Sequence, residues 1–565
     1  MVRLWGGIFV SEEYCQMKPQ TLFLRKATGL VRAWSVWDAF AYNALAVTLS
    51  PLGLYTFSYG SFLPADNWIP AILISFAIIF FLIFAYAMLM SVMPRAGGDY
   101  IWQSRILNPF LGFVFSWNTW VSVLWLWAPI YSTMMAYTFI SPMSVLLGQL
   151  TNNPSMYQAA IWWSTPDGLF AALLIVTAWI FVYVAVGVKN YARFQKVSFA
   201  LGTIGFLAFM GIMLATPRET FVSAFNQYWP TVSGQAVTYD DVIRRAANAG
   251  DWAMDFTKYP FALTITSPSL MLIPYAVMWN IWPNWCAPLS GEVRGASDFR
   301  RQALGMAMSS IMMNVLAIVT LLLIWTSMGY EFYNASNYLF WYRAYTGGDA
   351  TFPMFPYPVL LATLALRNPA LSIVIMFLVG LWGWAWTGTL VLSSTRAVFA
   401  MAFDRVLPTW FGRVTTRFRT PINCLILMSV MGLILGGLYV YNIVGFMTVT
   451  LDGVFVVVIG YTLTCIAAAI LPWRKRDEYN RSPISRYKIG GVPFITISGI
   501  IISLFLIWVM YMWAIYPVYG VNSPVSALYL LANYIGAAVI FIAFKLYRKK
   551  QGIDVAMLYK EIPVE

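Results

Sequence analysis

The sequence predicts an all-α membrane protein that crosses the bilayer twelve times. Of its 565 residues, 60% are hydrophobic and only 10% are charged, whereas a typical soluble domain carries roughly 25% charged residues. The apolar residues form long runs, such as 69–92 and 169–188, and a helix needs about 20 apolar residues to cross the hydrocarbon of a bilayer. The charged residues divide unequally between the two sides that these runs define, as a membrane topology requires.

The position of each span follows from apolar runs that end at charged or Pro/Gly-rich breaks. We expect spans at 34–57, 70–93, 109–142, 168–188, 194–215, 269–288, 303–327, 369–395, 421–440, 443–471, 492–514 and 524–546. No polar linker divides them, so we expect one membrane domain. Glu12 and Glu13 stand where a signal peptide would have a small-residue cleavage site, so we expect no cleaved signal peptide.

Lysine and arginine fix the predicted orientation. With both termini in the cytoplasm, 29 of the 35 Lys and Arg residues lie inside and 6 outside, as the positive-inside rule describes. We expect a multi-pass protein of the plasma membrane. The net charge of +13 then requires no nucleic acid partner, because basic segments such as 474–476 and 548–550 can lie against anionic membrane lipids. Among the 22 Asp and Glu residues, Asp452 alone is predicted to lie well inside a span, away from its ends.

The chain contains no histidine, and its four cysteines lie far apart. Haem centres, copper centres and histidine proton relays are commonly built with imidazole side chains. Cysteines that bind metals or undergo redox chemistry come in close pairs. We therefore expect no metal and no cofactor. An enzyme is not expected, because the spans hold no paired carboxylates or ligand clusters, and a channel would need a filter ring that the sequence does not show.

Two predicted spans contain proline where a helix would be interrupted. The first span contains Pro51 within 46–53, and the sixth contains Pro274, Pro283 and Pro288. Proline removes a backbone donor and clashes with the preceding turn, and transporters build their sites at such breaks in corresponding helices of two inverted halves. Five crossings separate the starts of the two elements, and an odd number of crossings inverts the second copy, which predicts a five-plus-five inverted repeat followed by two extra helices. The alternative is that the prolines only kink their helices.

This reading divides the chain into six segments. They are a cytoplasmic N-terminal segment (1–33), the first five-helix repeat (34–215), a long extracellular loop (216–268), the second repeat (269–471, with an extracellular loop at 328–368), helices eleven and twelve (472–546) and a cytoplasmic tail (547–565). Loops beyond about fifteen residues are usually functional or disordered. The aromatic content of these two argues against disorder, so we expect them to form a structured external cap.

Two motifs resemble those of a known family. Residues 93–100, Met-Pro-Arg-Ala-Gly-Gly-Asp-Tyr, resemble the P-R-A-G-G-[ED]-Y signature of the amino acid-polyamine-organocation permeases. Residues 394–408 resemble that family's S-R-x-x-F-A-M-A-R-D-G-x-L-P segment, and 291–293, Gly-Glu-Val, also have a counterpart there. The resemblance runs from about residue 25 to the end of the tenth helix. It implies the LeuT-type fold and, as the family's usual activity, amino acid transport.

Other positions depart from the family's pattern. Helix one usually has a glycine-rich break where this chain has Leu49-Ser50-Pro51, and helix six has a Gly-Phe-Glu-like step at 282–284, here Trp-Pro-Asn. Gly202 stands where some members have a proton-coupling lysine. These differences leave the substrate and the coupling ion open. They would also fit the alternative function, a nutrient receptor or scaffold subunit that retains the fold without transporting.

We expect a secondary transporter that moves an amino acid or a related amine by alternating access. The N-terminus of a half-helix carries partial positive charge and can bind a carboxylate, and carbonyls freed at a break can accept from an ammonium group. Backbone groups at the two breaks therefore supply both poles of the site. The residues predicted to bind substrate are Ala46, Val47, Ser50, Pro51, Leu52, Gly53, Trp279, Asn280, Trp282, Asn284, Trp386 and Asp452.

The predicted coupling ion is H⁺ or Na⁺, with exchange as a further option. Asp452 favours H⁺, because an ionisable group inside a span costs about 2.5–3.5 kcal/mol unless a proton or a cationic partner compensates it. The alternative is a protonated Asp with a structural role. Sodium would need hard oxygen ligands, which Thr387, Thr389 and Ser393 of helix eight could supply, although such hydroxyls more often bond their own backbone.

Gates are predicted on the inner side and at the sixth span. Asp404, after helix eight, could pair with Arg32, ahead of helix one, and close the inner mouth. Exposed ion pairs contribute little to stability, so this pair would act as a gate only if it became buried in one state. Trp279 or Trp282 could stack on the substrate. Anchoring at the membrane interface is the alternative role for these tryptophans.

Overall fold

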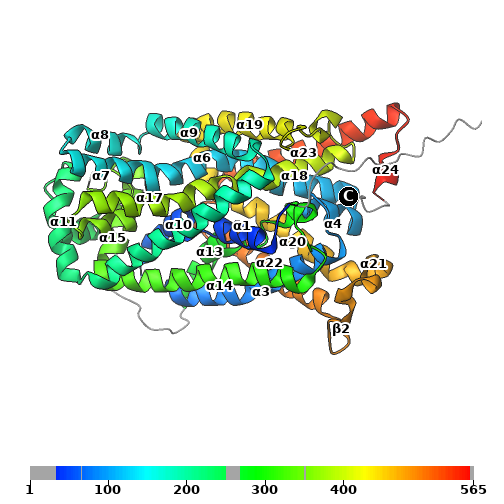
Figure 1. Ribbon diagram of the computed structural model, residues 1–565, viewed down its shortest axis with the longest axis horizontal. Helices are drawn as coiled ribbons and strands as arrows, with labels where there is room; N and C mark the ends of the chain where they lie inside the picture. The colour runs from blue at the N-terminus through cyan, green and yellow to red at the C-terminus, as the bar shows by residue number, and fades with distance from the viewer. Residues whose placement is uncertain (1–32, 65–66, 250–266, 349–350, 560–565) are drawn as a thin grey trace, which may run out of the picture.

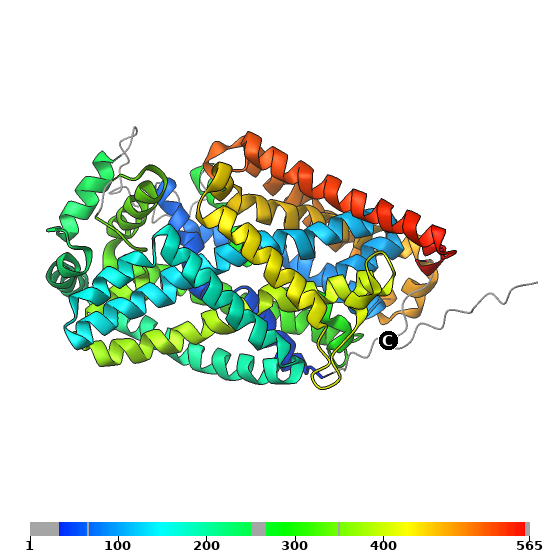
Figure 2. The same cartoon turned by 90° about the horizontal axis from the view of Figure 1, so that it is seen from above.

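The computed structural model describes residues 33–64, 67–249, 267–348 and 351–559, and these residues are mostly helical (Figure 1). The long helices run side by side along the long axis of the molecule (Figures 1 and 2). The strands in the described residues are β1 (Lys488–Ile489) and β2 (Val492–Pro493). They pair as a short antiparallel hairpin in which Lys488 lies opposite Pro493. The chain is therefore a helix bundle with a small hairpin at one end.

Ten helices in the described residues are long and apolar enough to cross a membrane. They are α3 (Trp68–Val92), the run α5–η4–α6–η5–α7 (Pro109–Thr151), α9 (Pro166–Ala185), α10 (Val188–Ala215), the run α14–η7–α15 (Phe299–Thr346), the run α17–α18 (Pro369–Phe403), α19 (Ile422–Val440), α20 (Thr450–Arg474), α22 (Phe494–Ile515) and α23 (Pro524–Lys550). Each coincides with a predicted span. The prediction of a multi-pass α-helical membrane protein is therefore confirmed.

The three composite runs consist of shorter helical pieces. Their parts are α5 (Pro109–Trp117), η4 (Asn118–Ser122), α6 (Val123–Met135), η5 (Ala136–Ile140), α7 (Ser141–Thr151), α14 (Phe299–Ile324), η7 (Trp325–Gly329), α15 (Tyr330–Thr346), α17 (Pro369–Thr387) and α18 (Thr389–Phe403). The first run was predicted to end at 142 and extends to Thr151, where Asn152 adopts a left-handed conformation that ends a helix. The third was predicted to end at 395 and extends to Phe403.

The remaining two predicted spans, the first and the sixth, are interrupted helices. The first consists of α1 (Val36–Ala46), η2 (Leu49–Gly53), α2 (Leu54–Ser58) and η3 (Tyr59–Phe62). The sixth consists of α13 (Ser267–Asn280) and, after a turn, η6 (Ala287–Glu292). The prediction that helix breaks occur in these two spans is confirmed.

The helices pack against partners that lie far apart in the sequence. The α1 helix packs on α14, and α13 packs on α3. The α10 helix packs on α17, while α20 packs on α6, η4 and α4 (Asp99–Ile106). The α9 and α19 helices pack against each other. The last helix, α23, lies along the outside of the bundle and is coloured red in Figure 2. Of its most apolar stretch of 18 residues, 11% is buried.

The two ends of the bundle differ. One end, which we call the capped end, carries α8 (Pro154–Trp162), α11 (Arg218–Ser233) and α15 (Figure 1). The opposite end, which we call the basic end, carries α4, α21 (Arg476–Arg481), β2, α24 (Val555–Leu558) and the C-terminus (Figure 1). Loops predicted to lie on opposite sides of the membrane thus lie at opposite ends.

The two long loops contain ordered helices in their described parts. The loop at 216–268 forms α11 and α12 (Tyr239–Asn248), and the loop at 328–368 contains α15 together with α16 (Pro358–Leu364). Aromatic side chains join the two loops. The ring of Tyr239 stacks on Phe332 at 4.6 Å, and Trp229 lies 4.8 Å from Phe352. These contacts form the cap after which we name this end.

Candidate functional site

The break in the first span surrounds Pro51. The α1 helix ends at Ala46, and Ser50 has extended backbone angles, φ −119° and ψ 124°. The hydroxyl of Thr48 donates to the Ser50 carbonyl at 2.6 Å, and the Gly53 amide donates to the Thr48 carbonyl at 3.1 Å. Local side-chain and backbone groups therefore satisfy part of what the interrupted helix leaves unpaired.

The break in the sixth span lies against the first. The indole nitrogen of Trp279 donates to the carbonyls of Val47, at 2.9 Å, and Thr48, at 3.2 Å. Across the second break, the Asn43 carboxamide accepts from the Cys286 amide at 3.0 Å. Trp279 was predicted to contact substrate and Val47 to offer it a carbonyl. The structure uses both groups to join the two breaks, because an unpaired carbonyl is costly in a dry interior.

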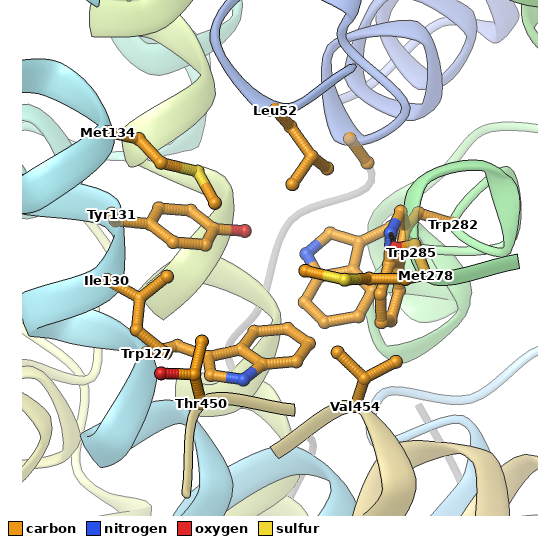
Figure 3. A pocket seen from close by; sticks show the side chains of 11 residues that line it. Leu52, Trp127, Ile130, Tyr131, Met134, Met278, Trp282, Trp285, Thr450 and Val454 are labelled. Carbon is orange, nitrogen blue, oxygen red and sulfur yellow. Dashed lines mark hydrogen bonds between the residues drawn. The ribbon is translucent and has the colours of Figure 1, made fainter. Parts of the chain in front are cut away.

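A central cavity lies between the two breaks (Figure 3). The residues that line it are Ala46, Leu52, Trp127, Ile130, Tyr131, Met134, Met278, Trp282, Trp285, Thr450 and Val454. None of these side chains is charged. The space open to water-sized molecules is about 30 Å³, enough for roughly two waters at about 10–15 Å³ each on this measure. Side chains must therefore move before an amino acid can enter.

Three tryptophan rings form one wall of the central cavity. Trp282 lies edge-on to Trp127, with ring centroids 5.2 Å apart, and edge-on to Trp285 at 5.3 Å. The indole of Trp282, in the turn after α13, donates to the Met278 carbonyl in the last turn of that helix at 2.8 Å. Opposite this wall, the hydroxyl of Tyr131 points into the cavity (Figure 3). The cavity is thus apolar and aromatic, with few polar atoms facing it.

The predicted substrate residues divide between this cavity and its supports. Ala46, Leu52 and Trp282 line the cavity. Other predicted residues are buried close to the breaks and are bonded to other helices. The Ser50 hydroxyl is 2.5 Å from that of Tyr357, and the Asn280 amide donates to Ser75 at 3.0 Å.

The remaining predicted substrate residues also lie outside the lining. They are Pro51, Gly53, Asn284 and Trp386, and all four are buried. Trp386 stacks on Tyr131 at 3.7 Å, and a side chain at Gly53 would meet the Trp279 indole at 2.9 Å. Asn284 is completely buried beside the second break. Trp386 thus supports the cavity wall through Tyr131, and none of the four is among the lining residues.

Asp452 points away from the central cavity. The residues of α20 that line the cavity are Thr450 and Val454, whereas Asp452 accepts a hydrogen bond from Ser526 of α23 at 2.6 Å. Residues two apart lie on opposite sides of a helix, so a carboxylate between two lining residues faces the other way. The prediction that Asp452 contacts substrate therefore does not fit this geometry. Its burial, with 0% exposure, agrees with its predicted place inside a span.

The hydroxyls predicted to hold sodium bond to nearby backbone instead. Thr387 donates to the Trp384 carbonyl at 2.8 Å, and Thr389 to Trp386 at 2.7 Å. Ser393 donates to the Trp285 carbonyl at 2.9 Å. These contacts occupy the hydroxyl hydrogens and leave the oxygen lone pairs that a sodium ion would use, so the sodium site stays a prediction.

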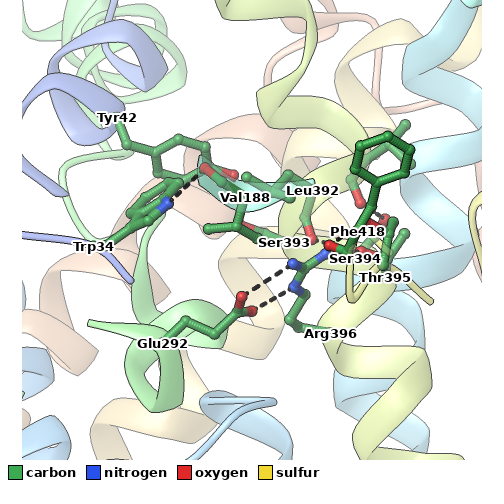
Figure 4. A network of polar contacts seen from close by, with 12 residues as sticks. Trp34, Tyr42, Val188, Glu292, Leu392, Ser393, Ser394, Thr395, Arg396 and Phe418 are labelled. Carbon is green, nitrogen blue, oxygen red and sulfur yellow. Dashed lines mark hydrogen bonds and ion pairs between the residues drawn. The ribbon is translucent and has the colours of Figure 1, made fainter. Parts of the chain in front are cut away.

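Two buried ion pairs lie between the cavity and the basic end. Arg396 of α18 binds Glu292 at the end of η6, with Nε 2.6 Å from Oε1 and Nη2 3.2 Å from Oε2 (Figure 4). Arg105 of α4 lies 2.6 Å from Asp404. Asp452 alone was predicted to lie well inside a span, but Asp99, Glu292 and Asp404 are buried as well, because segments between the predicted spans fold back into the bundle.

The predicted partner of Asp404, Arg32, lies outside the described residues. In the described part of the chain, Asp404 binds Arg105 and accepts from the Tyr100 hydroxyl at 2.9 Å. Arg396 lies in the motif at 394–408, and Arg105 lies shortly after the motif at 93–100. The two motifs therefore contact each other near the basic end. The sequence alone did not predict this contact.

A vestibule opens toward the capped end. It has a volume of about 790 Å³ and includes Tyr59, Tyr275, Tyr345 and Thr450 in its lining. A small cavity of about 20 Å³, also lined by Tyr59, Tyr345 and Thr450, lies next to it. Thr450 lines the vestibule, this small cavity and the central cavity. The three spaces therefore form a series along the start of α20.

Aromatic rings narrow this series of spaces. Tyr59 stacks between Trp341, at 4.9 Å and 17° between planes, and Tyr275, at 5.6 Å and 12°. Its hydroxyl donates to that of Tyr55 at 3.2 Å. Stacked aromatic rings thus close the central cavity toward the capped end. The two buried ion pairs lie on its other side, toward the basic end.

Several residues at the site were not predicted from the sequence. Trp127, Ile130, Tyr131 and Met134 line the cavity from α6 and its end. Their spacing of i, i+3, i+4 and i+7 marks one helix face, but a core face has the same spacing, so the pattern alone does not identify a site. Thr450 carried no signal, because a threonine near a helix start is ordinary.

Comparison with known families identifies the chain. The family model described as "Amino acid permease" matches residues 35–542, a range that contains both breaks, the cavity and the two ion pairs. A comparison with curated proteins finds no match. Members of the matched family are transporters and are not enzymes. The chain therefore belongs to the amino acid permease family.

Proposed function

We propose that the protein is a secondary active transporter that carries an amino acid or a related amine through the central cavity by alternating access. The observation that carries this proposal is the position of the cavity. It lies between two interrupted helices, with stacked rings toward the capped end and buried ion pairs toward the basic end. A site with a separate closure on each side is what alternating access requires. Membership in the family supports the same activity.

Helix packing supports a five-plus-five inverted repeat with α22 and α23 as the two extra helices. Exchanging the halves maps α1 onto α13 and α3 onto α14. The contact of α1 with α14 then becomes that of α13 with α3, and both contacts exist. The contact of α10 with α17 becomes that of α20 with the α5–α7 run, which also exists. This agreement favours twelve crossings in a LeuT-type arrangement.

The lining of the cavity favours a neutral amino acid with an apolar side chain. No charged side chain lines the cavity, so a cationic or anionic substrate side chain would lose its hydration without a compensating charge. Trp127, Trp282 and Trp285 offer ring faces on which an apolar side chain or an ammonium group can pack. Backbone groups at the two breaks would receive the carboxylate.

Protons are the proposed coupling ion. Asp452 is buried and accepts a hydrogen bond from the hydroxyl of Ser526, a neutral group. A carboxylate in this setting is compensated by a proton more readily than by water. The basic end is proposed to face the cytoplasm of a plasma membrane, as the distribution of Lys and Arg indicates.

The test is transport by the full-length protein in sealed liposomes. A panel of labelled amino acids, grouped as apolar, polar, cationic and anionic, is offered with an imposed proton gradient, an imposed sodium gradient or neither. We expect uptake of apolar members driven by the proton gradient. Uptake driven only by sodium would contradict proton coupling, and preference for charged members would contradict the substrate class. Neither uptake nor exchange of any member would favour the receptor or scaffold alternative.

A further inference from the structure

A second large cavity opens at the basic end, separate from the central cavity. It has a volume of about 530 Å³ and lies between the start of α10, the loop at 416–419 and the end of η6. Its charged lining residues are Lys189, Arg193, Arg417, Arg419 and Glu292. Glu292 is engaged by Arg396 at 2.6 Å (Figure 4). Four cations thus share a cavity whose single carboxylate is already neutralised.

The start of α10 adds further positive potential to this cavity. The helix begins at Val188 and is 28 residues long, and its first residues, Val188, Lys189 and Asn190, line the cavity. The first amide groups of a helix have no partner within the helix, and they carry about half a positive charge together with the helix dipole. An anion in the cavity would therefore meet both side-chain cations and backbone donors.

The walls of this cavity are held in place by close contacts. A side chain at Gly187, whose φ is +88°, would lie 2.6 Å from the Phe418 carbonyl, so only glycine allows the loop to approach α10 this closely. The Trp34 indole donates to the Val188 carbonyl at 3.3 Å, and Val188 and Phe418 both lie near the Glu292–Arg396 pair (Figure 4). These contacts therefore hold the segments that carry the four cations in a fixed arrangement.

We propose that this cavity binds a phosphate-bearing anion and that its source is the head group of an anionic membrane phospholipid. The apolar surface next to the cavity favours a lipid. Val182 and Val197 are 57% and 59% exposed, and they lie one helical turn from Val186 and Arg193, which line the cavity. A head group in the cavity would leave its acyl chains against these exposed faces of α9 and α10.

This proposal is independent of transport and is tested by binding alone. The full-length protein is purified in detergent and titrated with phosphatidylglycerol, with phosphatidylcholine or with inorganic phosphate, and bound molecules are counted by native mass spectrometry. The cavity variant is Arg193→Gln/Arg417→Gln, and Lys189→Gln/Arg419→Gln is the second. The matched control is Lys549→Gln/Lys550→Gln, which removes two exposed cations from the basic end outside the cavity. Thermal unfolding of each variant establishes that it is folded.

We expect both cavity variants to bind phosphatidylglycerol roughly thirtyfold more weakly than the unmodified protein, at about fivefold for each cation near a lipid phosphate. The control should retain full affinity, and phosphatidylcholine should bind weakly throughout. If inorganic phosphate binds with the same dependence on the four cations and the lipids do not, the anion site stands and its source is a soluble phosphate. Equal binding by the cavity variants and the unmodified protein, or an equal loss in the control, would overturn the proposal.

Discussion

Arg396 and Glu292 form a two-point ion pair, and their side chains are 0% and 2% exposed. One residue belongs to a helix of the second half, and the other follows the break in the sixth span. The pair therefore connects η6, the part of the sixth span that follows the break, to α18. Removing either partner would leave a buried charge without compensation, which makes the pair a sensitive point of the closed state.

Replacing Glu292 should destabilise the protein. In Glu292→Gln, the Arg396 guanidinium stays buried without a carboxylate, and breaking such a pair costs about 3–5 kcal/mol. We expect a clear drop in the thermal unfolding midpoint, measured in detergent with an intrinsic-fluorescence readout. The matched control is Asp298→Asn, which breaks an ion pair whose side chains are 66% and 44% exposed and should change the midpoint little. An equal effect of the two substitutions would contradict the importance of burial.

The indole N–H of Trp279 should be needed to join the two breaks. Trp279→Phe keeps an aromatic ring but leaves the Val47 carbonyl without the donor that lies 2.9 Å away. A buried carbonyl that loses its partner costs about 1–3 kcal/mol, so we expect a lower unfolding midpoint and slower uptake in liposomes. Trp473→Phe, at a tryptophan that is 64% exposed, serves as the control. Normal stability and uptake in Trp279→Phe would show that the bridge is dispensable.

A methyl group at Gly453 should disturb the central cavity. The added Cβ would lie 2.2 Å from the indole nitrogen of Trp127, so the ring must shift within the cavity wall. We expect Gly453→Ala to reduce uptake of large apolar amino acids more than that of small ones, measured as kcat/KM in liposomes. Gly536→Ala makes the same change in α23, where nothing lies within 4 Å, and should transport normally. A uniform loss for all substrates would point to a general packing defect instead.

Asp452 should control the response to a proton gradient. Asp452→Asn keeps the size of the side chain and can still accept from Ser526, but it cannot release a proton. We expect gradient-driven accumulation to disappear while exchange of labelled for unlabelled substrate continues. Asp167→Asn, at an exposed carboxylate near the capped end, is the control. Proton-driven accumulation by Asp452→Asn at the normal rate would exclude this carboxylate from coupling.

Much of the fold was predictable because hydropathy is a property of each segment on its own. Ten predicted spans correspond to long apolar helices, and the proline positions predicted both breaks. The substrate site was predicted less well. Ala46, Leu52 and Trp282 line the cavity, but Trp279 and Asp452 do not, since the sequence does not reveal how a helix is rotated about its axis in the bundle.

The sequence by itself determined that this protein lies in a membrane, where its helices run, which two are interrupted and which family it resembles. Apolar length, proline and short motifs are local features, and a single segment is enough to show them. The tertiary structure alone decided that Trp279 bridges the breaks, that Asp404 binds Arg105 and that Asp452 faces α23. Those outcomes depend on which helices pack together and on their rotation, and both are set by contacts between residues far apart in the chain.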